Sequence, residues 1–139
     1  CPQGISWEGE AACKLEGLAQ KRKLTDSPVT MPISDNHLDL ASFWRQWLDF
    51  SAPIEDKAFA FHAALADGLA ALAKRHAAQQ GVTTLVLCGG VLHNQLLRRR
   101  LTAQLAPLSV IYPEMLPMGD GGLSLGQAVN AISLLKRVK

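Results

Sequence analysis

Residues 82–94 are Val-Thr-Thr-Leu-Val-Leu-Cys-Gly-Gly-Val-Leu-His-Asn, and this stretch gives the clearest indication of the fold. Residues 82–88 form a largely apolar run with valine and threonine, which is typical of a buried strand in a parallel sheet. Two glycines end the run, and a leucine-rich segment with helical spacing follows. A strand that turns directly into a helix predicts an α/β fold, in which ligands bind beyond the carboxyl ends of the strands.

Apolar residues at helical spacing flank this stretch. A long helix is expected to begin after Pro53 and to end near Gln80, where Gly81 fits the stop signal. Its apolar stripe is expected to consist of Phe61, Leu65, Leu69, Leu72 and His76. Further helices are expected over residues 41–50, 92–106 and 121–138, and a second strand over 109–112. With 22 leucines and 19 alanines, these elements predict a helix-rich α/β chain with a small sheet.

The N-terminal third contains one expected helix and a linker. Ser6 or Trp7 is a candidate cap for a helix that ends in the basic residues 21–23. Residues 24–37 form a linker with two prolines. Short extended pieces are expected in and after it, over residues 29–33 and 38–40.

Composition excludes several classes of protein. The 139 residues suffice for one domain or for one lobe of a larger one, and 48% hydrophobic residues exclude a disordered chain. A net charge of +2 gives no support for a nucleic acid or an anionic membrane as partner. No apolar run reaches the roughly 18 residues that a membrane-spanning helix needs. The widely spaced Cys1, Cys13 and Cys88 indicate a reducing compartment, so we expect a cytoplasmic location.

The Gly89-Gly90 turn is the first candidate site. Glycine lets a ligand approach the backbone, and the N–H groups of the following helix are expected to be free to bind an anion. The amide of Asn94 has two donors and an acceptor, which suit a base or a ribose. A tight turn that needs a positive φ accounts for the same glycines without any ligand.

Asp120 is the second candidate, because it lies among Gly119, Gly121 and Gly122 just before the last helix. Its carboxylate suits a hard metal ion, directly or beside a phosphate, and equally suits a helix cap. Gly126 costs about 1 kcal/mol against alanine inside a helix. We therefore expect Gly126 to pack closely against another segment.

The stretch Trp7-Glu8-Gly9-Glu10 is the third candidate. Carboxylates at the start of a helix could bind ribose hydroxyls, but they also stabilise the helix dipole with no ligand present. Other residues favour structural roles: His62 as a packed or surface histidine, residues 98–100 as a solvated basic face, and Cys88 as a buried apolar group. The aromatic residues 43, 44 and 47 are expected in the core or at a partner contact.

Three motifs together resemble the C-terminal end of the HypF family of carbamoyltransferases, which act in [NiFe]-hydrogenase maturation. They are SWEGEAA at residues 6–12, LCGGVLHN at 87–94 and GDGGLSLGQA at 119–128. Their order and spacing agree with the family over nearly the whole chain. The resemblance implies one lobe of a two-lobed domain of the actin, sugar kinase and Hsp70 (ribonuclease H-like) superfold, with residues 1–139 as the second lobe and the upstream domains absent.

The resemblance also implies the chemistry. Family members move a carbamoyl group from ATP-derived carbamoyladenylate to the C-terminal cysteine of a partner, HypE, for cyanide ligand synthesis. Gly89, Gly90 and Asn94 would lie on the nucleotide, Glu8, Gly9 and Glu10 near its sugar, and Asp120 would complete the site of a divalent metal ion.

Two positions depart from the family pattern. Cys88 stands where serine is usual, and His93 where glutamine or a small residue is usual. The paired histidines of the metal site belong to the first lobe, so we expect this chain alone to be inactive and to bind nucleotide weakly. The alternative is a non-catalytic module with structural glycine turns that self-associates or binds a partner. A third hypothesis is a kinase relative of the same superfold.

Overall fold

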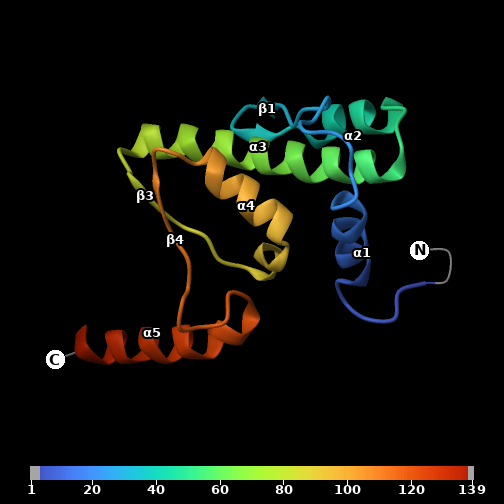
Figure 1. Cartoon of the computed structure of the whole chain (residues 1–139). Helices are drawn as coiled ribbons and strands as arrows, with labels where there is room; N and C mark the ends of the chain where they lie inside the picture. Colours follow the sequence, from blue (N-terminus) through green and yellow to red (C-terminus); the bar gives the residue numbers. More distant parts are fainter. Residues whose placement is uncertain (1–3, 138–139) are drawn as a thin grey trace.

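The computed structural model describes residues 4–137, in which five α-helices and two small sheets follow one another along the chain (Figure 1). The helices are α1 (Glu10–Ala19), α2 (Leu40–Asp49), α3 (Ile54–Gln80), α4 (Gln95–Gln104) and α5 (Leu123–Arg137). The strands are β1 (Ile33–Ser34), β2 (His37–Leu38), β3 (Thr84–Val86) and β4 (Ser109–Ile111). Two short 3-10 helices, η1 (Gly90–His93) and η2 (Asp120–Gly122), precede α4 and α5. The two ends of the lobe expected over residues 1–139, and the expected helix end at residue 138, lie outside the described residues.

The long helix α3 is the centre of the fold, and its alanines form the core. Pro53 precedes its first residue and Gly81, with φ 64°, ends it, as the sequence predicts. Three groups of buried side chains contact it, from α4, from α2 with the linker, and from α1. The buried alanines of α3 are Ala58, Ala60, Ala63, Ala64, Ala66, Ala70 and Ala77.

The expected apolar stripe of α3 is confirmed in part: Phe61, Leu65 and Leu69 pack against the core, but most of the buried residues are alanines. Its leucines are only half-buried, and His76 is exposed. Alanine has no bulk beyond Cβ, so neighbouring elements can pack on several sides of one helix. In Figure 1, α4 lies below α3, α1 below its right-hand end, and α2 with β1 along the opposite side.

The two sheets are small. β1 and β2 form an antiparallel hairpin with Asp35 and Asn36, both at positive φ, in its turn. β3 and β4 pair in parallel, with Leu85 opposite Val110. The parallel pairing confirms the prediction, but the expected burial of β3 is wrong, because Val86 is 64% exposed. Helices cover only one face of this pair, so the apolar run faces solvent on the other.

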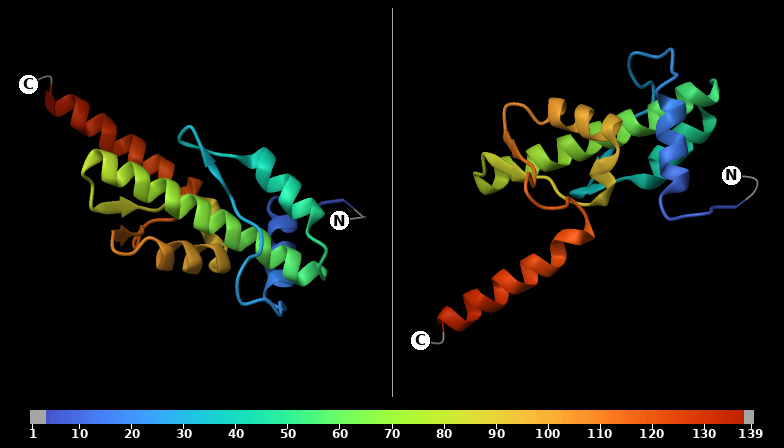
Figure 2. Two further views of the ribbon diagram at one scale, coloured as in Figure 1. Left: turned by 90° about the horizontal axis from the view of Figure 1, so that it is seen from above. Right: turned by 60° about the horizontal axis from the view of Figure 1, so that its bottom comes forward.

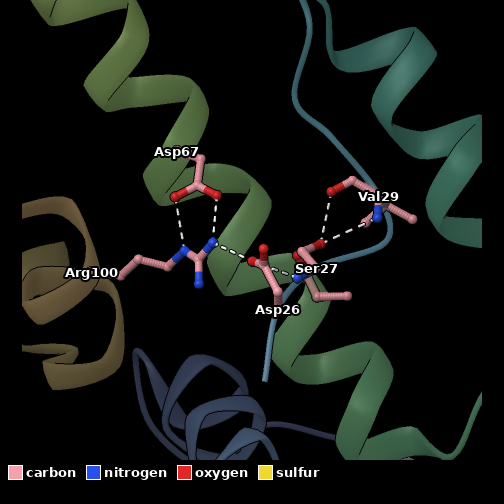
Figure 3. A network of polar contacts seen from close by, with 6 residues as sticks. Asp26, Ser27, Val29, Asp67 and Arg100 are labelled. Carbon is pink, nitrogen blue, oxygen red and sulfur yellow. Dashed lines mark hydrogen bonds and ion pairs between the residues drawn. The ribbon is translucent and has the colours of Figure 1, made fainter. Parts of the chain in front are cut away.

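Hydrogen bonds and an ion pair connect the linker to the helices. Oδ1 of the buried Asp56 in α3 accepts hydrogen bonds from the N–H groups of Lys23 and Leu24, at 2.8 and 3.0 Å. Arg100 of α4 donates to both carboxylate oxygens of Asp67 at 2.8 and 2.7 Å and to Asp26 at 2.6 Å (Figure 3). Arg100 thus joins α4, α3 and the linker, and the expected solvated basic face is wrong at this residue.

The last helix, α5, projects away from the rest of the molecule (Figure 2). Its described side chains, residues 123–136, are all exposed. The exposed apolar residues of α5 are Leu123, Leu125, Val129, Ile132, Leu134 and Leu135. The expected close packing at Gly126 does not occur within residues 4–137, where a Cβ would meet nothing within 4 Å. Four of these apolar residues, Leu125, Val129, Ile132 and Leu135, recur at helical spacing on one side of α5, and we call them the α5 apolar face. No helix in the described part of the chain has the length and apolar character needed to cross a membrane.

Candidate functional site

Two turns that are thirty residues apart in the sequence meet at one place. The N–H of Gly89 donates to the carbonyl of Met118 at 2.6 Å. A Cβ added to Gly119 would lie 3.5 Å from Cα of Gly90. A hollow of about 530 Å³ lies beside this contact, with walls from Cys88 and Gly89, the loop 113–122 and the first half of α5. The predicted meeting of the glycine turn with the Asp120 loop is therefore present.

The backbone conformation requires glycine at only one of the two positions in the first turn. Gly89 has φ 114°, which side chains rarely adopt, so the turn itself needs it. Gly90 has no positive φ, and a Cβ there would meet nothing within 4 Å. The described part of the chain gives no reason for glycine at position 90. The N–H groups of Gly90 and Val91, at the start of η1, have no acceptor within residues 4–137.

Asp120 is exposed at the rim of the hollow. Its carboxylate makes no hydrogen bond within residues 4–137, and α5 begins three residues later, so the expected side-chain cap is wrong. Among the described residues, no group of three histidine, cysteine, aspartate or glutamate side chains is arranged to hold a metal ion. One carboxylate does not fit a divalent cation, which needs several oxygen ligands. Asp120 as one ligand of a larger site stays a prediction.

The N-terminus of α4 is capped by side chains of the protein itself. Oε1 of Glu16, which reaches across from α1, accepts from the N–H groups of Gln95 and Leu96 at 2.8 and 3.2 Å. Oδ1 of Asn94 accepts from the N–H of Leu97 at 2.9 Å. The expected free N–H groups for an anion are therefore occupied, because a carboxylate and an amide cap them. Sequence patterns missed Glu16, which is 79 residues from Gln95.

Asn94 is held on its other side by a histidine. Its Nδ2 lies 2.8 Å from Nε2 of His62, whose Nδ1 lies 2.7 Å from the carbonyl of Ala58. His62 is packed and buried, which is the first of the two structural roles that the sequence left open. The role of Asn94 on a nucleotide stays a prediction, and Asn94 is not among the residues that line the hollow.

Glu8, Gly9 and Glu10 lie at the start of α1, outside the lining of the hollow. Gly9, at φ 85°, precedes the helix without a side-chain cap, so the expected cap by Ser6 or Trp7 is wrong. Glu10 is buried; it accepts from the Ser6 N–H and from Lys14, both at 2.5 Å. The Lys14 ammonium and the Ser6 N–H hold the pKa of Glu10 below its ordinary value. Glu8 is exposed. Their contact with a sugar stays a prediction.

Cys88 lines the hollow and is exposed, so its expected role as a buried apolar group is wrong. It lies two residues after the end of β3, in the segment that leads to the glycine turn. The aromatic residues behave as expected: Phe43 is buried, and Trp47 packs edge-on to Trp44 with ring centroids 5.6 Å apart.

Comparison with known proteins decides the family. Residues 1–127 match a family model described as carbamoyltransferase, Kae1-like domain, second subdomain (HypF_C_2). The chain belongs to this family. A HypF carbamoyltransferase of Rhodobacter capsulatus is 33% identical over 136 residues, which are 98% of this chain and 18% of that protein. This HypF-family chain therefore spans less than a fifth of that relative.

Solved HypF structures have the same fold. The crystal structure of T. kodakarensis HypF is similar with a TM-score of 0.84 and 29% identity, over 94% of this chain and 17% of that one. A full-length HypF in a phosphate- and nucleotide-bound form has a TM-score of 0.79 and 28% identity, over 94% of this chain and 18% of that one. The predicted α/β lobe of a HypF carbamoyltransferase is thus confirmed.

Proposed function

We propose that this chain forms the nucleotide-binding half of a HypF-type carbamoyltransferase, with the ligand at the meeting of the Gly89-Gly90 turn and the Asp120 loop. The observation that carries the proposal is Gly90. Neither backbone conformation nor neighbouring atoms require glycine there. A ligand that lies against the backbone does require it, because a Cβ would occupy its place.

The local chemistry supports a phosphorylated ligand. The N–H groups of Gly90 and Val91 have no acceptor within residues 4–137 and are suitable donors to phosphate oxygens. The hollow lined by the preceding Gly89 and by Asp120 is of the size of small-molecule sites, although Gly90 and Val91 are not themselves in its lining. A full-length HypF with a similar fold is phosphate- and nucleotide-bound, which agrees with this ligand class.

The whole reaction is proposed to transfer a carbamoyl group from carbamoyladenylate to the C-terminal cysteine of a HypE-type acceptor, with ATP as the source of the adenylate. Such an intermediate needs a site that excludes water. The hollow of this chain is built from three segments of one lobe, and the resemblance assigns the rest of the site to the other lobe, so we propose that the chain alone binds nucleotide weakly and transfers nothing. Incubation with carbamoyladenylate and the acceptor should leave the acceptor mass unchanged; gain of a carbamoyl group would contradict this.

Titration with ATP and Mg²⁺ tests the binding proposal. The Gly90→Ala variant should fold like the original chain, because its Cβ meets no atom, but should bind nucleotide at least about tenfold more weakly. Gly17→Ala is the matched control, since Gly17 lies in α1 with nothing within 4 Å of its Cβ position. Shifts of the Gly90 and Val91 amide signals on titration detect even millimolar binding. Equal affinity in both variants would refute a ligand at Gly90.

A non-catalytic, self-associating module is the second candidate, and the α5 apolar face favours it. Large exposed apolar patches mark interaction sites. Tight dimers without nucleotide binding would support this candidate over the first.

A further inference from the structure

His62 and Asn94 form a hydrogen-bonded pair directly behind the glycine turn. His62 is 4% exposed in the middle of α3, and its ring packs edge-on against Phe61 with centroids 5.7 Å apart. Nδ1 faces the carbonyl of Ala58 at 2.7 Å, and Nε2 faces Nδ2 of Asn94 at 2.8 Å. Both ring nitrogens therefore have one partner each.

These partners determine the proton positions one after another. The N–H of Leu97 can only donate, so the Asn94 atom that faces it must be the oxygen, Oδ1. The other end of the amide, Nδ2, therefore donates to His62, and Nε2 must accept. The proton of the neutral ring then lies on Nδ1, where the Ala58 carbonyl accepts it. A doubly protonated ring would place two donors against each other at Nε2.

We propose that His62 is a positioning residue that locks the Asn94 amide, so that Asn94 offers one N–H donor in a fixed direction to a ligand. One Nδ2 proton is bound to His62, and Oδ1 is bound to the helix end. The second Nδ2 proton has no partner in the described part of the chain, and Asn94 is only half-buried. Because an amide is planar, two fixed atoms fix the direction of the remaining N–H bond.

This lock determines which ligand groups Asn94 can bind. A group that accepts hydrogen bonds, such as a phosphate, carbonyl or hydroxyl oxygen, satisfies the remaining N–H, whereas a group that can only donate does not. The identity of the ligand as a nucleotide rests on the proposed function. The lock itself depends only on the contacts of His62 and Asn94.

Nuclear magnetic resonance of the chain with ¹⁵N-labelled histidine tests the lock without any ligand. The signals should show the His62 proton on Nδ1 and a bare Nε2. Asn94→Asp keeps the cap, since aspartate caps helices as well as asparagine does, but removes the donor to Nε2. In that variant we expect a proton to appear on Nε2.

Asn36→Asp, which makes the same change in the exposed β1–β2 turn, is the control and should leave the His62 signals unchanged. A protonated Nε2 in the original chain would overturn the proposal. So would an Asn94→Asp variant with unchanged His62 signals.

Replacement of His62 tests the effect on binding. His62→Leu removes the acceptor for Nδ2, and ATP binding should weaken about tenfold, the size expected for one hydrogen bond. His62→Gln offers an amide oxygen in place of Nε2 and should restore affinity to within about twofold. A purely structural role predicts equal losses in both variants, and equal affinity in all three chains would also overturn the proposal.

The proposed nucleotide site and the His62–Asn94 lock can be refuted independently of each other. If the original chain binds no ATP at millimolar concentration, the proposed function fails, and the ring experiment still decides whether the lock exists. If His62→Leu does not fold, the His62 proton position in the Asn94→Asp variant still decides whether the lock exists.

Discussion

A methyl group added at Gly68 should destabilise the protein, although the same change normally stabilises a helix. Gly68 lies in the interior of α3, where alanine is favoured over glycine by about 1 kcal/mol. A Cβ at this position, however, would lie 2.6 Å from both Cβ and Cγ of Met31 and 3.2 Å from its carbonyl oxygen. Met31 is buried against Phe43 in the core between α3 and the linker.

The magnitude follows from the two opposing terms. Overpacking a core with one methyl costs about 1–3 kcal/mol. The contact is with Cβ and backbone of Met31, which cannot rotate away, so the linker itself must shift and the upper half of this range applies. After the helix gain of about 1 kcal/mol, the free energy of unfolding should fall by about 1–2 kcal/mol. Tm should fall by about 3–8 °C for a chain of this length.

Urea unfolding followed by tryptophan fluorescence measures this loss, and Gly17→Ala is the matched control. Gly17 also lies inside a helix, but its Cβ position is empty, so this variant should gain up to about 1 kcal/mol. Met31→Gly removes the atoms in the way, so Gly68→Ala should cost less in that background. If Gly68→Ala were as stable as Gly17→Ala, the packing argument would be refuted.

Three further predictions concern charge and surface. Arg100→Lys loses the paired contact with Asp67 and should lower the free energy of unfolding by about 1 kcal/mol at this partly exposed site. Arg99→Lys should leave urea unfolding unchanged, and equal effects of the two variants would contradict the role of the Arg100 network. Hydrogen bonds from Ser42 hold the pKa of Asp39 below its ordinary value, so its contribution to stability is present above about pH 4 and is lost as pH falls through its lowered pKa. Asp39→Asn should flatten that part of the pH–stability curve, and an unchanged curve would exclude Asp39 as its cause. Val129→Lys on the α5 apolar face should reduce self-association in sedimentation velocity far more than Asn130→Lys. Equal sedimentation of the two variants would show that this face is not the surface of self-association.

Local signals predicted the elements well, since they depend on chemistry within a few residues. Proline at 53 and glycine at 81 marked both ends of α3, because one lacks an N–H and the other adopts a positive φ. The glycines after β3 and before α5 marked the two turns of the site. Their meeting was predictable because a strand end and a nearby loop share one edge of an α/β sheet.

The remaining features depend on contacts between distant residues. The carboxylate of Glu16 caps α4 from another helix, and no spacing along the chain indicates it. The periodicity of α3 predicts that its leucines are buried. The buried side chains are mostly alanines, because neighbouring elements pack on several sides of this helix. Cys88 is exposed although an apolar run leads up to it, because such a run does not reveal which elements pack around it.

The capped end of α4 limits how an anionic ligand can lie at this site. Glu16 occupies the first N–H groups of α4 with a negative charge, so a phosphate gains nothing from that helix end and is repelled there. The donors without acceptors are on the other side, at Gly90 and Val91, where the turn touches Gly119. The residue after Gly119 is Asp120, which brings a second carboxylate to the adjoining hollow, and no arginine or lysine lines that hollow. The charge of a bound phosphate must therefore be offset from outside this lobe, by a cation that accompanies the ligand or by a group on the facing surface. The same electrostatic argument explains why the second lobe alone should bind nucleotide weakly.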